Sequence, residues 1–316
     1  MANTTFSGPV RSENNVQLIS KTASTGVIHD RTQMSSKLWD ARRYYLYEPF
    51  LQRPGLNAIN IIDADANDAT ALAATQAANK NFETLGTNYT TALTTFPGTQ
   101  AGILMTTATT DQDQAILLPH LDTNQSAWSK VLWGTENQVE WECSINLAAT
   151  DNQKVWAGLK LTNDQLPETD ADQAYFYYAS DATNGQDLST FTPWYFIQSV
   201  NGTDYLTNLG ITVAASTNYH FRISIDSDRK TSIFINGVQY SATTTAATTF
   251  DGSTEITGTT QATIAESYSA TNANTQKGPA MKNDVDLIPY IGIECGAGAA
   301  EALNVHYTAI SRHVFE

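Results

Sequence analysis

The sequence predicts a mainly-β fold, an antiparallel sandwich of two sheets, from three observations. Residues 139–147 alternate strictly between apolar and polar side chains, which is typical of a strand with one face on a core. Asn236-Gly237 separates two apolar runs, and this dipeptide favours the two-residue turn of a β-hairpin. Further short apolar runs, divided by turn residues, lie at 115–118, 155–161, 174–178, 221–225, 288–293 and 303–310.

The composition allows a sizeable core, because 41% of the 316 residues are apolar and only 16% are charged. The apolar runs are too short for a membrane-spanning helix, and the first residues lack the cationic and apolar regions of a secretory signal peptide. Cys143 and Cys295 lie in separate strand-like runs, so we expect two buried free thiols in a protein assembled in a reducing cytoplasm. A disulfide would require those two strands to be neighbours.

The pattern divides the chain into three parts. Residues 1–56 are rich in Ser, Thr and Asn, so we expect an extended N-terminal attachment arm that becomes ordered only against a partner. Residues 57–110 form a linker or accessory region, in which the Ala-rich stretch 66–82 predicts one short helix. Residues 111–316 hold the β-sandwich, and the Thr-rich stretch 241–280 predicts a long surface excursion from it.

Charge is divided unevenly between the arm and the rest of the chain. Residues 1–56 carry seven basic and four acidic side chains, a net +3, whereas the remainder carries ten basic and 28 acidic ones, a net −18. Such an acidic body disfavours a nucleic-acid partner, although aromatic and Arg side chains also stack on bases. Trp, Tyr and Arg, which are enriched at protein interfaces, gather in residues 38–47. The predicted partner-binding residues are Phe6, Pro9, Arg11, Trp39, Arg42, Arg43, Tyr44 and Tyr45.

Glu140 and Glu142 are the strongest candidates for catalysis, because alternation places both on one face of a strand and paired carboxylates hydrolyse glycosidic bonds. We interpret them instead as the polar outer face of that strand. The sequence contains no G-x-S-x-G, P-loop or G-x-G-x-x-G motif, and its five His have no metal-ligand spacing. Asp63, Asp65 and Asn67 imitate the start of a calcium loop whose later ligand positions are not filled. We therefore expect no enzyme activity, no cofactor and no metal.

Aromatic runs at 175–178 and 194–196 offer rings that stack on sugars, and Trp194 and Tyr195 are the candidate glycan-binding residues. The same side chains would also fill a core or a subunit interface, which is the more frequent use of large aromatic residues.

Residues 219–226, followed by residues 232–238, resemble the paired strands of concanavalin-A-like sandwiches, which include the laminin-G-like ones. Residues 287–312 are similar to the last strands of the same fold. The resemblance covers roughly residues 111–316 and implies a concanavalin-A-like jelly-roll sandwich. Some enzymes of that fold carry an E-x-D-x-E motif, but here the third acid is missing after Glu142.

Residues 4–12 are similar to the opening of virion structural proteins of marine tailed bacteriophages, cyanophages among them. This resemblance implies a capsid decoration (cement) protein or head fibre, assembled in the host cytoplasm, that binds the major capsid protein through its arm. By analogy with decoration proteins at local threefold positions, we expect a homotrimer on the capsid surface. The alternative function is a carbohydrate-binding adhesin of a head fibre or tail fibre, with a host surface glycan as its partner.

Overall fold

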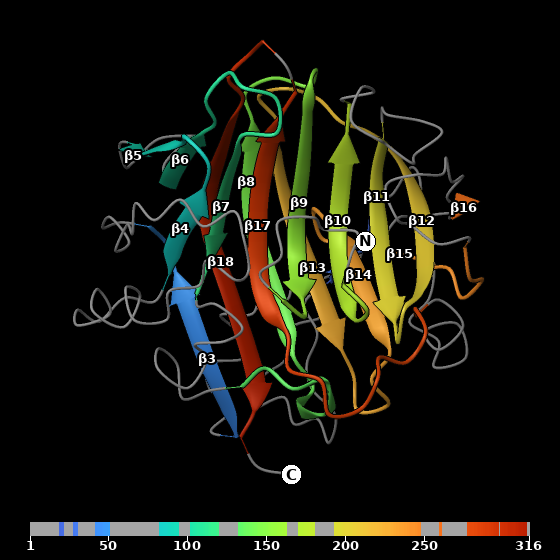
Figure 1. Cartoon of the computed structure of the whole chain (residues 1–316). Coiled ribbons are helices and arrows are strands. Elements are labelled where there is room, and N and C mark those ends of the chain that lie inside the picture. Colours follow the sequence, from blue (N-terminus) through green and yellow to red (C-terminus); the bar gives the residue numbers. More distant parts are fainter. Residues whose placement is uncertain are drawn as a thin grey trace, which may run out of the picture.

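The chain forms two β-sheets packed face to face, which confirms the predicted antiparallel sandwich (Figure 1). The computed structural model describes residues 19–21, 28–30, 42–50, 82–94, 102–119, 132–162, 170–180, 193–247, 259–260, 277–296 and 298–314. Within these ranges, no helix is both long and apolar enough to cross a membrane.

One sheet has ten strands, and the C-terminal strand lies in its interior. In spatial order its strands are β1 (Ile19–Lys21), β2 (Ile28–Asp30), β15 (Val238–Tyr240), β14 (Thr231–Ile235), β13 (Asn218–Ile225), β8 (Glu140–Leu147), β18 (Ala302–His313), β6 (Gly102–Thr106) and β5 (Thr90–Thr94). The tenth strand, β3 (Arg43–Glu48), pairs with the second half of β18, whereas β6 pairs with the first half. Figure 1 shows β3 in blue beside β18.

The other sheet has eight strands and lies against the inner face of the first. In spatial order its strands are β16 (Thr259–Thr260), β12 (Thr203–Thr212), β11 (Pro193–Val200), β10 (Gln173–Ala179), β9 (Gln153–Lys160), β17 (Ile288–Cys295), β7 (Gln114–Leu118) and β4 (Glu83–Gly86). All its pairings are antiparallel except the two-residue contact of β16 with β12.

The core lies between the two sheets, where the inward-facing residues of their strands meet. Phe176 of β10 stacks on Phe221 of β13 with ring centroids 4.3 Å apart, and Trp194 of β11 packs edge-on against the same Phe221 at 4.8 Å. Cys143 of β8 and Cys295 of β17 are free and buried, as predicted, and they lie in different sheets. Large aromatic side chains from both sheets thus hold the sandwich together by apolar burial and ring contacts.

The predicted hairpin turn is confirmed at residues 236–237, which join β14 to β15. Asn236 and Gly237 have φ of +51° and +78°, and the turn that matches the twist of paired strands requires positive φ at both positions.

Residues 1–56 do not form a separate extended arm where the structure describes them. Instead β1, β2 and β3 are strands of the ten-stranded sheet, in which β2 pairs with β15 and β3 pairs with β18. The sequence pattern missed β1 and β2 because backbone pairing stabilises three-residue segments whose side chains show no clear alternation. It missed β3 because an aromatic and basic segment is equally typical of a partner-binding surface. Strands β4, β5 and β6 likewise lie within residues 57–110, so the sandwich begins before residue 111. The helix expected over residues 66–82 lies, apart from Phe82, outside the described residues.

Candidate binding surface

Three tyrosines and a histidine gather on the outer face of the ten-stranded sheet, and we call this group the tyrosine surface. It consists of Tyr45 and Tyr47 of β3, Tyr307 of β18 and His220 of β13. Successive residues of a strand point to opposite faces, so Tyr45 and Tyr47 share the outer face of β3. Tyr307 and His220 come together because both strands pair with β8, where each lies opposite Ser144.

The rings of the tyrosine surface form one continuous row. The centroids of Tyr45 and Tyr47 are 6.3 Å apart with nearly parallel planes. The row continues from Tyr47 to Tyr307 at 5.7 Å and from Tyr307 to His220 at 6.0 Å. Tyr47 is 47% exposed, the highest value for a large apolar side chain in the described ranges. The exposed Tyr47 ring, flanked by the half-buried rings of Tyr45 and Tyr307, is therefore presented to solvent.

A β-bulge in β18 turns Tyr307 toward this row. The pairing of β18 with β8 shifts between Val305 and Tyr307, so that His306 is an extra residue without a partner opposite it in β8. Val305 points into the core, and without the bulge the alternation of the strand would turn Tyr307 inward as well. The bulge thus decides which face of the sheet receives the Tyr307 ring.

Two carboxylates lie next to the tyrosine surface, on the neighbouring strand β8. Glu140 and Glu142 point outward, as the alternation predicts, but both side chains are buried. An Nη1 atom of Arg222 lies 3.9 Å from an Oε1 atom of Glu140, and the Arg222 guanidinium lies 3.8 Å from the centroid of the Phe234 ring. The two carboxylates considered as catalytic candidates therefore form part of a buried polar layer.

The charge of Glu142 affects the tyrosine hydroxyls. Burial, and after it the negative charge of Glu142, raises the pKa of Tyr45, Tyr47 and Tyr307 above the ordinary value of a tyrosine. All three hydroxyls therefore stay protonated at neutral pH, and a protonated hydroxyl is able both to donate and to accept a hydrogen bond.

His220 is neutral at the same pH. Burial, assisted by the positive charge of Arg222, lowers the pKa of His220 to about 4. Its Nε2 atom lies 3.8 Å from an Oε2 atom of Glu142, so this contact is not an ion pair at neutral pH. The same Nε2 is buried and makes no hydrogen bond to the residues that the structure describes.

The residues predicted to bind a partner do not all lie on one surface. Phe6, Pro9, Arg11 and Trp39 lie outside the described residues. Arg42 is exposed, and Tyr44 is exposed on the face of β3 opposite the tyrosine surface. Arg43 holds its own strand in place, because its guanidinium donates to the Ser311 hydroxyl at 2.8 Å and to the Gln138 carbonyl at 2.9 Å. Tyr45 belongs to the tyrosine surface.

The candidate glycan-binding residues Trp194 and Tyr195 are both buried, so neither offers an exposed stacking platform in this structure. Trp194 points into the core, where its ring lies 5.3 Å from that of Tyr219. Tyr195 points the other way, into a buried cluster on the outer face of the eight-stranded sheet. The aromatic run that suggested stacking on sugars is divided between two buried layers.

That buried cluster fills the outer face of the eight-stranded sheet with large aromatic rings. Its aromatic members are Trp156, Tyr175, Tyr177, Tyr195 and Tyr290. Gly292 makes room for the Trp156 ring, because a Cβ atom at residue 292 would lie 2.3 Å from it. At one end of the sheet the Lys160 ammonium lies 3.7 Å from a carboxylate oxygen of Asp170 and 4.7 Å from the centroid of the Tyr290 ring.

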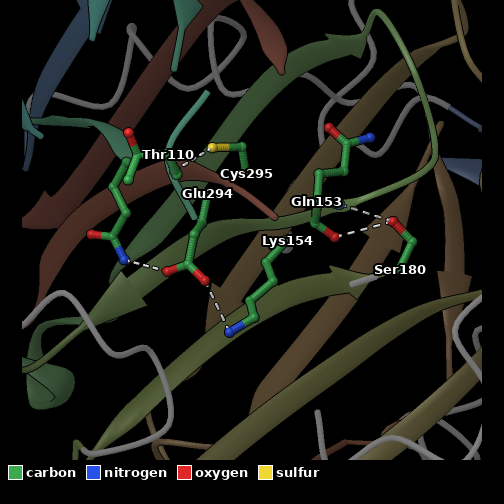
Figure 2. Close-up of polar contacts among 7 residues, drawn as sticks. Thr110, Gln153, Lys154, Ser180, Glu294 and Cys295 are labelled. Atoms are coloured by element: carbon green, nitrogen blue, oxygen red, sulfur yellow. Dashed lines mark hydrogen bonds and ion pairs between the residues drawn. The ribbon is translucent and has the colours of Figure 1, made fainter. Parts of the chain in front are cut away.

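A second buried ion pair lies on the same face, six residues from Lys160 along β9, and Figure 2 shows its contacts. The Lys154 ammonium is 2.9 Å from a carboxylate oxygen of Glu294, and the Gln114 amide donates to the other oxygen at 2.6 Å. The neighbouring Cys295 thiol donates to the Thr110 carbonyl at 3.1 Å. Within the described ranges, no three His, Cys, Asp or Glu side chains are grouped as ligands for a metal ion.

The architecture defines an antiparallel β-sandwich that displays an aromatic row on its ten-stranded sheet. No family model matches the chain, and neither does any curated protein. Among solved structures it is similar to a protein of unknown function from Shewanella oneidensis MR-1, at 13% identity over 90% of this chain and 95% of that chain, with a TM-score of 0.46. It is also similar to peanut lectin, at 10% identity over 86% of this chain and 97% of that chain, with a TM-score of 0.42. A Bacillus licheniformis β-glucanase is similar at 11% identity over 84% of this chain and 97% of that chain, with a TM-score of 0.38. These similarities concern the fold alone.

Proposed function

We propose that the protein is a non-catalytic carbohydrate-binding protein and that the tyrosine surface is its binding site. The exposed Tyr47 ring, continuous with Tyr45 and Tyr307, is the observation that carries the proposal. A pyranose ring has a face of C–H groups and a rim of hydroxyls, so it complements an aromatic plane edged by hydrogen-bonding groups. The protonated tyrosine hydroxyls supply that polar edge.

Tyr47→Ala is expected to weaken carbohydrate binding at least about tenfold, because it removes the exposed stacking face. Tyr47→Phe keeps the ring and should retain most of the affinity. The full chain is screened on a glycan array, and the sugars that bind are then titrated by calorimetry with each variant. Tyr44→Ala is the matched control, since Tyr44 is also exposed but lies on the opposite face of β3.

Two outcomes would contradict this proposal. One is an array on which the folded full chain binds no glycan. The other is a glycan whose affinity is unchanged by Tyr47→Ala, which would place the binding site elsewhere on the protein.

A second candidate function is attachment to a bacteriophage capsid as a decoration protein on the virion surface. It is supported by the basic balance of residues 1–56 against an acidic remainder and by the exposed Arg42 just before β3. Deleting residues 1–56 would also remove β1, β2 and β3 from the sheet, so a point variant tests this function more cleanly.

Arg11→Glu is expected to lower occupancy on purified phage capsids, measured by co-sedimentation, because it reverses a charge near the start of the basic segment. Lys282→Glu, a charge reversal at an exposed residue of the acidic body, is the control and should leave occupancy unchanged. Equal occupancy for the Arg11 variant and the unchanged chain would count against a charge-guided attachment.

A further inference from the structure

Three exposed apolar side chains gather at one end of β3 and β18, and we call them the apolar end patch. They are Tyr44, Leu132 and Val314, with exposed fractions of 39%, 42% and 45%. In the described ranges only one other large apolar side chain, Tyr47, is exposed, and it belongs to the tyrosine surface. Contiguous exposed apolar groups on a soluble domain mark contact surfaces, whereas isolated ones are ordinary.

Direct contacts hold the apolar end patch together. The backbone N–H of Val314 donates to the Arg42 carbonyl at 2.7 Å, and the Arg312 guanidinium donates to the Leu132 carbonyl. Tyr44 pairs with Arg312 in the strand register. The centroid of the Tyr44 ring also lies 5.8 Å from the centroid of the ring of Trp133, the residue after Leu132. The patch is therefore built on paired strands and a buried tryptophan.

Charges of both signs border this patch. On its acidic side are Glu136, Asp284 and Asp286, brought together because Gly134 pairs with Asp286 and the Thr135 N–H donates to the Val285 carbonyl. The basic side chains are Arg42, which is exposed, and Arg312. Arg312 lies close enough to the acidic side for its positive charge to act on Asp286, so Arg42 forms the basic half and the three carboxylates form the acidic half next to the same apolar centre.

The carboxylates of the acidic half lie close to one another. One carboxylate oxygen of Glu136 is buried without a hydrogen-bond partner among the described residues. Burial and the negative charges of Glu136 and Asp284 raise the pKa of Asp286, while Arg312 opposes this shift. A cation supplied from outside the chain would relieve this concentration of negative charge.

We propose that a second copy of this chain docks on the apolar end patch around a twofold axis. A twofold axis places the same patch on both copies, so the basic half of one faces the acidic half of the other while the apolar centres meet. Each copy carries a net charge of −15, so approach is favourable only where the local charges are balanced, as they are here. Three apolar side chains form a small centre, so the interface belongs to the weak, reversible class.

Sedimentation velocity of the full chain over a concentration series up to about 100 μM is expected to show a reversible monomer–dimer equilibrium. Leu132→Asp should weaken the dimer at least about tenfold, because it places a carboxylate in the apolar centre. Leu132 is exposed in the single chain, so this variant should keep its thermal unfolding temperature. Tyr47→Ala is the matched control and should leave the dimer unchanged.

A charge-swap experiment tests the twofold arrangement itself. Arg42→Glu and Asp284→Lys should each weaken self-association, because each makes the facing halves alike in charge. An equimolar mixture of the two variants should restore dimers. In the mixed dimer the carboxylate introduced into one copy faces the ammonium introduced into the other, and the unchanged Asp284 of the first copy faces the unchanged Arg42 of the second.

Three results would overturn the proposal. The first is a monomer throughout the concentration series, and the second is a dimer that Leu132→Asp leaves unchanged. The third is a trimer, because a threefold ring does not bring identical patches together. Loss of capsid binding in Leu132→Asp, with the chain remaining monomeric at all concentrations, would assign the patch to the capsid protein and also overturn self-association.

Discussion

Gly102→Ala is expected to abolish stable folding, or to lower the free energy of unfolding by at least about 4 kcal/mol. Gly102 begins β6 with φ of +137°, a conformation that side chains with a Cβ atom rarely adopt. A Cβ atom there would also lie 2.1 Å from the carbonyl oxygen of Val305 in β18. The first obstacle is the backbone angle of residue 102 itself, and the second is a backbone carbonyl of the paired strand. No side-chain rotation therefore relieves either of them.

The measurement is urea unfolding of the purified variant, with soluble yield as the readout if it does not fold. Gly202→Ala is the matched control, because Gly202 also has a positive φ, +76°, but nothing lies within 4 Å of a Cβ atom there. We expect that control to cost only about 1–3 kcal/mol, from backbone strain alone. Similar losses for the two variants would show that the close approach of β6 to β18 is not the cause.

The effect of Gly102→Ala bears on the tyrosine surface as well as on stability. Val305 borders the bulge that turns Tyr307 outward, and the clash would push directly on that part of β18. If a destabilised variant remains folded, its carbohydrate affinity should therefore also fall.

Lys154→Met is expected to lower the free energy of unfolding by about 3–5 kcal/mol, because it leaves the buried carboxylate of Glu294 without its cation. The Gln114 amide would still donate to Glu294, but one neutral hydrogen bond does not replace an ion pair at a buried site. Urea unfolding at neutral pH measures the loss. Lys282→Met, at an exposed lysine, is the control and should change stability by less than about 0.5 kcal/mol.

The double variant Lys154→Met with Glu294→Met separates the ion pair from the loss of packing. Replacing both charges by apolar groups of similar length removes the unpaired carboxylate, so we expect most of the stability to return. Losses that simply add in the double variant would show that the two charges do not interact energetically, and would contradict the importance of this pair.

Local pattern was enough to predict several strands and their inward faces. Strict alternation over residues 139–147 predicts β8, with Trp141 and Cys143 inward, because the period of a strand depends only on its own backbone. The Asn236-Gly237 turn is similarly local, since both residues tolerate positive φ. The sequence pattern did not predict that the outward residue Glu142 is buried, because that depends on what the neighbouring strands place around it.

The sequence by itself determined that this chain is an antiparallel β-sandwich with a strongly acidic body, since periodicity, turn chemistry and composition are local properties. That Cys143 and Cys295 stay free was decided by the strand order, which places them in different sheets. Only the tertiary structure decided which aromatic rings reach solvent. Trp194 and Tyr195 are buried, while Tyr47 is exposed and meets Tyr307 from the far end of the chain. Strand order, register and one bulge control that outcome, and all three arise from pairing between segments that are distant in sequence.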